Sequence, residues 1–204
     1  KDESVLWREL SKGHRSNINK ARRLGVRIGR EPFSGDGLNA FVRLYERTME
    51  RNRAKESWRF PKAFFSNCGT CLGQEHVSLL SAFLGEERVT SYLLIHSFRT
   101  VYYHFAASDE QHFALRANNL LLYEAALWAK AQGYKLFHLG AGLDLDDGVY
   151  RFKASFSSTV AWLYAYTCIH DSGRYERLCK LRDQWDCRHG VGRHQTEFFP
   201  AYRR

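Results

Sequence analysis

The chain has 204 residues, of which 44% are hydrophobic and 15% aromatic, so it can bury one core without disulfides and is not disordered. Its net charge of +9 favours polyanionic partners such as RNA, nucleotide phosphates or anionic lipid headgroups. No run of about 18 apolar residues and no signal-peptide pattern occurs, which excludes a spanning helix and predicts a cytoplasmic protein. Five cysteines, an odd number, fit reduced thiols in the same compartment.

The first third of the chain predicts helices and one strand. Apolar residues recur at helical spacing through the first segment, and Gly25 is a typical helix end. VRIGRE then alternates as a strand does. In chain order we predict a helix over 4–24, a strand over 26–31, a helix from 34 to about 53, and a short helix from 61 to about 71.

The N-terminal helix is strongly basic. From Leu10 to Arg30 there are seven Lys or Arg and no Asp or Glu. Such a face can bind the phosphates of RNA or of a nucleotide, and a solvated charged face explains the pattern equally well.

The middle of the chain predicts an antiparallel meander followed by a helical crossover. HVSLLSAFLG, VTSYLLIHS and TVYYHFAAS are rich in β-branched and aromatic residues. After them we predict a helix over 115–132, the strand YKLFHLG, a short helix over VYRFKA, the strand TVAWLYAYTCI, a helix over 173–185 and a basic tail. This order indicates an α+β domain with a mixed sheet over 1–170, and a C-terminal helix and tail over 171–204.

The crossover predicts where a ligand binds. A helix that connects TVYYHFAAS to YKLFHLG makes these strands parallel and the connection right-handed. Because ligands prefer the carboxyl ends of parallel strands, we expect the strands to splay there, with the loops 108–116 and 140–148 side by side. Lys153 follows the second loop among aromatic and small residues. It either extends its ammonium to water or serves a site that needs a positive charge.

Three short motifs do not indicate a site. Gly140-Ala-Gly142 lacks the third glycine of a dinucleotide fingerprint, and the aspartates before Gly148 do not match a calcium loop. Cys68-Gly-Thr-Cys71 has no second close-spaced ligand pair, as a structural zinc site requires. We therefore predict no metal site.

Three stretches taken together resemble a known family: SKGHRSNINKARRLGVRI, YYHFAASDEQHFALRANNLLLYEAALWAKAQGYKLFHLGAG and DGVYRFKASFS. They are similar to the Fem-type (FemABX) aminoacyltransferases of peptidoglycan bridge synthesis, and to the wider group of BioF2-like acyltransferases. The resemblance covers residues 8 to 160 and implies a GNAT-like fold, a mixed sheet flanked by helices. Fem-type enzymes usually contain two such domains, and this chain resembles the second. We expect a fragment whose N-terminal helix (1–24) and C-terminal tail contact a missing first domain.

The resemblance implies that Phe152 and Lys153 are catalytic. In the Fem-type enzymes this Phe-Lys pair is held at the reacting carbonyl, where the ammonium stabilises the oxyanion formed as an amine attacks an ester or thioester. A positive charge placed where negative charge develops is often a leading catalytic contribution, and an apolar surrounding strengthens it.

Four further residues are predicted to bind substrate. Arg59 lies near the position where the Fem-type family tends to carry a phosphate-binding arginine. Two residues on the third meander strand could line the acceptor groove, and one begins a loop before the long helix. They are Arg59, Tyr103, His104 and Arg116.

The loop at Arg116 departs from the CoA-dependent GNAT pattern RxxGxG/A. Its two glycines, which let backbone N–H groups hold a pyrophosphate, are replaced by Asn119 and Leu121. This argues against ordinary acetyl-CoA binding.

The sequence predicts an acyl- or aminoacyltransferase that acts on an amine of a cell-envelope (peptidoglycan or polysaccharide) precursor. The donor is aminoacyl-tRNA or acyl-CoA, and no further cofactor is expected. One alternative is an acyl-CoA-dependent N-acyltransferase for a sugar or an amino acid. Another is a non-catalytic half that binds RNA or a nucleotide-linked precursor.

Overall fold

The computed structural model describes residues 2–142, 148–157, 159–161, 164, 166–191 and 199–203. The chain divides into two compact units, Lys1–Val160 and Ala161–Arg204, so the division lies near residue 160 rather than at the expected 170. Within the described part, no helix is both long and apolar enough to cross a membrane.

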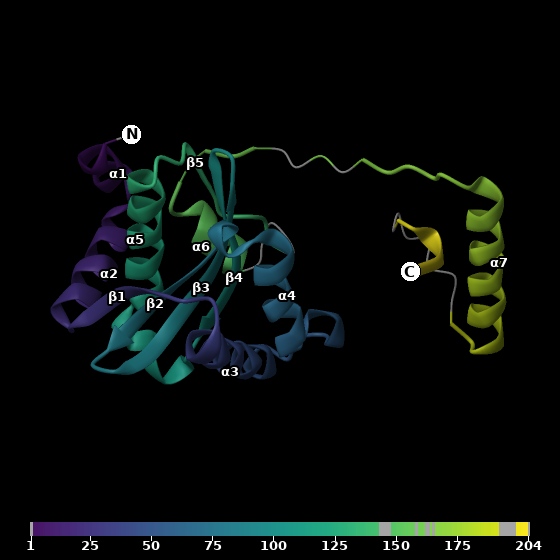
Figure 1. Ribbon diagram of the computed structural model, residues 1–204, viewed down its shortest axis with the longest axis horizontal. Helices are drawn as coiled ribbons and strands as arrows, with labels where there is room; N and C mark the ends of the chain where they lie inside the picture. Colours follow the sequence, from purple (N-terminus) through teal and green to yellow (C-terminus); the bar gives the residue numbers. More distant parts are fainter. Residues whose placement is uncertain are drawn as a thin grey trace. The chain divides into compact units, whose positions relative to one another are not determined.

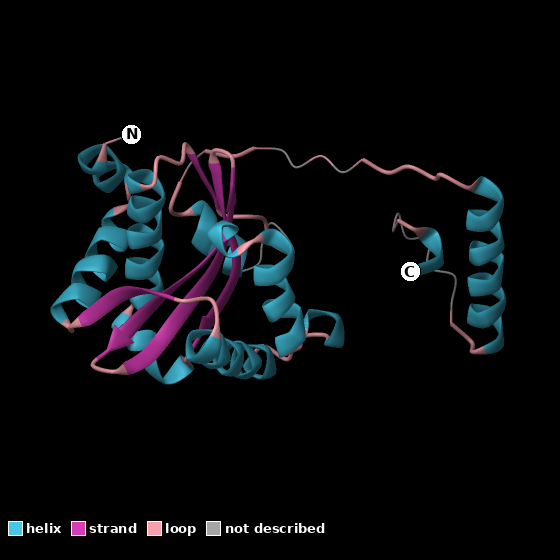
Figure 2. Ribbon diagram, in the orientation of Figure 1, coloured by secondary structure: helices cyan, strands magenta, loops and turns pink. Residues whose placement is uncertain are grey.

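The first unit is built on a five-stranded mixed sheet with the strands in chain order, shown in magenta in Figure 2. The first four strands are antiparallel neighbours, and the last pair is parallel. This confirms the predicted meander and the predicted parallel crossover. The strands are β1 Val26–Glu31, β2 Val77–Leu84, β3 Glu87–Ser97, β4 Thr100–Ser108 and β5 Leu136–His138.

The helices follow the predicted order with small changes of length. In the first unit they are α1 Glu3–Glu9, α2 Lys12–Arg23, α3 Gly35–Arg51, α4 Lys62–Leu72, α5 Ala117–Ala131 and α6 Gly148–Ala154. The second unit contains α7 Ser172–Arg188. Short 3₁₀ helices are η1 Glu56–Trp58, η2 Gln74–His76, η3 Glu110–Leu115 and η4 Ala201–Arg203.

Helices cover both faces of the sheet and enclose two cores. Helices α2 and α5 cover one face, and α3 and α4 the other (Figure 1). Neighbouring residues of β3 show the separation, because Leu94 is fully buried in the first core and Leu93 in the second. Alternate residues of a strand face opposite sides, so one central strand supplies both cores.

The N-terminal segment is two helices and not the single predicted helix over 4–24. Leu10 has an extended backbone, and Ser11 caps α2 by accepting the backbone N–H three residues on. Leu10, Ile18 and Ala21 are buried in the core that α2 shares with α5. The apolar face of α2 therefore packs on this domain, and the expected contact of the N-terminal segment with a further domain stays a prediction.

The predicted strand TVAWLYAYTCI is wrong for the residues that the structure describes. None of its described residues is in a strand, and Val160, Tyr164 and Tyr166 are 74%, 86% and 90% exposed. β-Branched and aromatic side chains favour a strand only when a neighbouring strand pairs with its backbone. The pattern alone could not reveal whether a partner strand pairs with this segment.

The second unit has contacts of its own. The ring of Tyr175 on α7 lies 6.0 Å from that of Phe199 and 5.7 Å from that of Tyr202, measured between centres. Phe199 is 41% exposed, and Phe198 lies outside the described residues. The C-terminal aromatics therefore pack in part on the helix that precedes them.

Candidate functional site

The parallel strands β4 and β5 are paired only at their beginning. The register joins Thr100 to Leu136, Val101 to Phe137 and Tyr102 to His138. β5 then ends, whereas β4 continues to Ser108. The pairing therefore ends at Tyr102, and we call the edge of β4 beyond it the opening. The expected separation of the two strands toward their carboxyl ends stays a prediction.

A bulge in β4 decides which side chains border this opening. Leu93 pairs with Phe105 and Leu94 with Tyr103, so His104 has no partner across the ladder. One extra residue reverses the alternation of the strand. Tyr103 therefore faces the core of α2 and α5, while Phe105, two residues later, faces that of α3 and α4.

Lys153 extends its side chain toward the sheet. It lies on α6 and is half-buried, and its Nζ donates a hydrogen bond to the carbonyl of Ala141, just after β5, at 2.8 Å. Nζ also lies 5.1 Å from the centre of the Tyr103 ring on β4, a cation–π contact. Gly140 has φ +73°, a backbone conformation that favours glycine, and its Cα lies beside the ammonium.

The position of Lys153 bears on the two roles that the sequence left open, and its catalytic role stays a prediction. The ammonium contacts residues from both sides of the opening, Tyr103 on β4 and Ala141 after β5. The loop over 108–116 begins only at the end of β4, five positions beyond Tyr103. Among the described residues, Tyr103 and Ala141 contact the ammonium. The expected pairing of the two loops falls in part on residues 143–147, which lie outside the described residues.

Phe152, the other predicted catalytic residue, packs in the core of α2 and α5. Its ring centre lies 5.3 Å from that of Phe156 and 6.1 Å from that of His14. Successive residues of a helix point about 100° apart. One member of the Phe-Lys pair therefore anchors α6, and the other reaches the opening.

Tyr103 connects the opening to the interior. Its ring lies edge-on to that of Tyr92, with centres 4.6 Å apart. Burial raises the pKa of both phenols. Both therefore stay neutral near pH 7, and neither neutralises the lysine charge.

Beyond Tyr92, the first turn of α5 is closed by a polar network centred on Asn118. The Asn118 side-chain oxygen accepts hydrogen bonds from three hydroxyls at 2.9 to 3.1 Å, those of Thr90, Tyr92 and Ser108. Tyr92 also contacts the Asn118 carbonyl at 3.0 Å. These groups satisfy one another inside the protein.

The replaced glycines of the CoA loop are buried side chains. Asn119 is 7% exposed and Leu121 is fully buried. Arg116 is exposed and adopts the left-handed conformation before α5, and its carbonyl accepts the Asn119 N–H at 3.0 Å. The first turn of α5 thus presents side chains where a pyrophosphate-binding loop presents bare backbone.

A buried histidine that the sequence analysis did not single out connects three helical segments. His14 on α2 is 8% exposed; its Nδ1 lies 2.7 Å from Nδ2 of Asn119, and its Nε2 lies 2.7 Å from the hydroxyl of Ser155, just after α6. Burial lowers the pKa of His14, so the ring is neutral near pH 7. The signal was present, because His14 shares the buried stripe with Ile18 and Ala21.

Arg59 and His104 do not join this arrangement through any contact of the described residues. Arg59 is held locally, since its Nε donates to the Ala54 carbonyl at 3.2 Å and lies 4.0 Å from the Glu56 carboxylate. His104 is exposed at the bulge, with its ring 4.5 Å from that of Phe105. Their predicted roles in substrate binding stay predictions.

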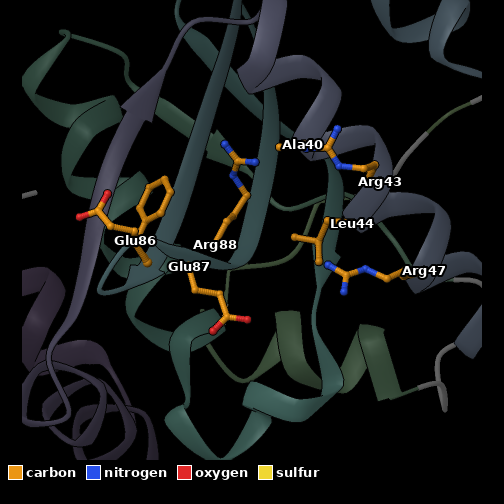
Figure 3. A pocket seen from close by; sticks show the side chains of 8 residues that line it. Ala40, Arg43, Leu44, Arg47, Glu86, Glu87 and Arg88 are labelled. Carbon is orange, nitrogen blue, oxygen red and sulfur yellow. The ribbon is translucent and has the colours of Figure 1, made fainter.

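A separate hollow of about 300 Å³ lies between α3 and the turn from β2 to β3, and none of the predicted site residues lines it. Figure 3 shows Arg43 and Arg47 on the α3 side and Arg88 on the strand side. Arg88 pairs with the Glu31 carboxylate, and Arg47 pairs with Asp109 at 3.1 Å. Two of its three arginines are thus already neutralised by the protein.

Near this hollow, Glu87, Asp109 and His112 bring potential metal ligands within 4.8 Å of one another. His112 Nε2 lies 3.4 Å from the Glu87 carboxylate, and Arg47 forms an ion pair with Asp109. One of the three candidate ligands, Asp109, is thus already paired with an arginine. The predicted absence of a metal site stays a prediction.

Comparison with known proteins agrees with this geometry. Residues 9–154 match the model of a family described as acetyltransferase (GNAT) domain. The crystal structure of FemX superposes with a TM-score of 0.64 at 15% identity, covering 76% of this chain and 55% of FemX. An aminoglycoside acetyltransferase from an uncultured soil metagenomic sample, in complex with trehalose, gives 0.53 at 15% identity, covering 72% of this chain and 97% of that one. No curated protein sequence matches the chain.

These comparisons confirm the predicted fold. The mixed five-stranded sheet flanked by helices is a GNAT fold, and it is Fem-like in that FemX shares it. At such low identity the structural likenesses establish the fold alone, and this chain spans about half of FemX (55%). The finer assignment to the BioF2-like group stays a prediction.

Proposed function

Because this chain belongs to the acetyltransferase (GNAT) domain family, we propose that it transfers an acyl or aminoacyl group to an amine, with Lys153 as the catalytic cation. The observation that carries the proposal is the direction of the lysine. Its ammonium is turned toward the sheet, where it contacts Tyr103 on β4 and Ala141 just after β5. A lysine that served only to cover apolar surface would instead extend its ammonium to water.

The reaction requires stabilisation of one developing charge. When the acceptor amine attacks the ester or thioester carbonyl of the donor, a C–N bond forms and the carbonyl oxygen becomes an oxyanion. The ammonium of Lys153 stabilises that oxyanion. The intermediate then collapses, the C–O or C–S bond breaks, and the proton lost by the amine ends on the leaving group. The Tyr103 ring and the Ala141 carbonyl hold the charge in place beforehand.

We propose aminoacyl-tRNA as the donor. The first turn of α5 is filled by the buried side chains of Asn119 and Leu121, which leaves no glycine cradle for the pyrophosphate of CoA. The chain carries a net charge of +9, and Lys12, Arg23 and Arg30 are exposed on and after α2. These charges suit the phosphates of RNA. An amine of a cell-envelope precursor is the proposed acceptor, and the cytoplasmic location belongs to the same proposal.

One observation favours acyl-CoA-dependent N-acylation as the second candidate. The chain spans nearly the whole length (97%) of an aminoglycoside acetyltransferase, whereas it spans only 55% of FemX. In that case the acceptor would be an amine of a sugar or an amino acid. A non-catalytic RNA-binding half is less favoured, since it has no use for an ammonium directed into the sheet.

A parallel assay separates these candidates. The protein is incubated with lysyl- or alanyl-tRNA and with acetyl-CoA, each with a muropeptide amine and an aminoglycoside as acceptors, and products are measured by mass. We expect transfer from charged tRNA, and loss of it in Lys153→Met. Transfer only from acetyl-CoA would support the second candidate. Turnover that Lys153→Met leaves unchanged would contradict the catalytic role of Lys153 with either donor.

A further inference from the structure

The helix that carries Lys153 has little packing of its own. α6 has seven residues, Gly148–Ala154, and none of them is buried. A helix this short is not stable by itself in water, so contacts with the rest of the domain must set its position. Lys153 can meet a reacting atom only if these contacts hold its backbone within a fraction of an ångström.

A chain of hydrogen bonds ends on the peptide group next to Lys153. Nδ2 of Asn119 faces Nδ1 of His14 at 2.7 Å, so Nδ1 accepts and the ring hydrogen is on Nε2. Nε2 then donates to the Ser155 oxygen at 2.7 Å. The Ser155 hydroxyl in turn donates to the carbonyl of Phe152 at 2.7 Å. That carbonyl belongs to the peptide bond that joins Phe152 to Lys153.

The chain begins in rigid parts of the domain. His14 lies on α2 and Asn119 on α5, and both are more than nine-tenths buried. The imidazole also packs against the ring of Phe156, with centres 4.0 Å apart. The buried pair of His14 and Asn119 therefore fixes the short helix α6 relative to the packed helices α2 and α5.

We propose that His14 is a positioning residue for Lys153, acting through Ser155 on the Phe152–Lys153 peptide. The hydrogen bonds themselves do not depend on the reaction. Their catalytic consequence rests on the function proposed above. In this arrangement the basic helix α2 helps to position Lys153, in addition to its proposed role in binding the phosphates of RNA.

Two substitutions of His14 separate the two ends of the chain. Glutamine places an amide N–H near the position of Nε2, so His14→Gln keeps the donor to Ser155. Asparagine is shorter and reaches only toward Asn119, so His14→Asn loses that donor. Ser155→Ala removes the link from the other side. His96→Gln is the matched control, because His96 is also a buried histidine (4% exposed) with both ring nitrogens engaged, by Ser78 and Tyr134.

The readout is the reactivity of Lys153 itself, which needs no donor substrate. Full-length protein is labelled briefly by reductive dimethylation, and the modification of Lys153 is measured by peptide mass relative to the exposed Lys130. His14→Asn and Ser155→Ala each remove one hydrogen bond of the chain that holds the Phe152–Lys153 peptide. This loss should raise the ratio about fivefold. The ratio should stay at the wild-type value in His14→Gln and His96→Gln. The double variant His14→Asn/Ser155→Ala should match either single one, since both remove the same link.

The outcomes are distinct. Equal ratios in the wild-type protein and all five variants, or equal increases in His14→Gln and His14→Asn, would overturn the positioning role and leave His14 as a core residue. If the ratios follow the prediction and wild-type protein transfers no acyl group, the positioning stands and the proposed function fails. If transfer is found, kcat should fall about fivefold in His14→Asn with KM unchanged, because the effect is on the charge that meets the oxyanion.

Discussion

Two places beside β4 are built in opposite ways. One is the opening, at Tyr103, and the other is the first turn of α5, which contacts β4 at Ser108. At the opening, an aromatic ring and a carbonyl hold the ammonium of Lys153, a group that carries charge. At the turn, three hydroxyls converge on Asn118, and every group is neutral. The first arrangement is suited to stabilising a developing charge and the second to closing a gap in the core.

This contrast supports the proposed place of the chemistry and explains a departure from the CoA pattern. The residues that replace the glycines are not neutral substitutions, because Asn119 contacts His14 and Leu121 belongs to the core. The turn has become part of the scaffold that supports α6. The three predictions below test the contrast from the largest expected effect to the smallest.

Lys153→Met should have the largest effect. Methionine keeps most of the stem and removes the charge, so turnover should fall about a hundredfold or more while the midpoint of unfolding changes little. Lys153→Arg should not restore full activity, because a planar guanidinium cannot replace a compact ammonium at the Ala141 carbonyl. Steady-state kinetics and thermal unfolding measure the two effects.

Lys130→Met is the matched control for that experiment. Lys130 is an exposed lysine on α5 whose Nζ lies 3.8 Å from the Asp2 carboxylate, an ion pair of small energetic weight. Its replacement should leave turnover at the wild-type level. A comparable loss in both variants would show that net charge, and not the placement of Lys153, governs activity.

Asn118→Ala should affect stability and not chemistry. It removes the shared acceptor of three hydroxyls, so the free energy of unfolding should fall by about 2 kcal/mol in urea denaturation. Asn118→Asp keeps an acceptor oxygen in the first turn of a helix and should cost less. A loss of turnover in Asn118→Ala that exceeds the loss of folded protein would place the α5 turn in the site. It would contradict a purely structural role for that turn.

The smallest effect is the dependence of stability on pH. Burial lowers the pKa values of His14 and His96 below the ordinary 6.5, so the unfolded chain binds protons more readily than the folded one. The stability that the two neutral histidines contribute is therefore complete above pH 6.5. It is lost as the pH falls from 6.5 through their lowered pKa values. The slope is at most about 1.4 kcal/mol per pH unit for each histidine.

Urea denaturation between pH 5 and 8 separates the two regions by this slope. His14→Gln and His96→Gln should each flatten it, whereas Asn118→Ala should lower the whole curve by a constant amount, because its partners Thr90, Tyr92 and Ser108 do not ionise in this range. An unchanged slope in both histidine variants would mean that carboxylates control the acid side of the curve.

Much of the fold followed from local pattern. VRIGRE became β1 with the predicted bounds, and the meander and the crossover helix formed where periodicity placed them. The strand predicted at TVAWLYAYTCI did not form in its described residues, because composition reports the preference of a segment and not the presence of a partner strand. The break at Ser11 was missed since one capping serine within a helical pattern changes the periodicity little.

What the sequence determined by itself was the order of the elements, the parallel pairing of β4 and β5, and Lys153 as the residue to examine. These depend on hydrophobic period, turn residues and the handedness of a crossover, which are local properties. Only the tertiary structure decided the bulge at His104 that turns Tyr103 toward the lysine, and the contact of His14 with Ser155, 141 positions apart in the chain. Both arise from packing between distant segments, where register and side-chain direction are settled by neighbours that no local pattern specifies.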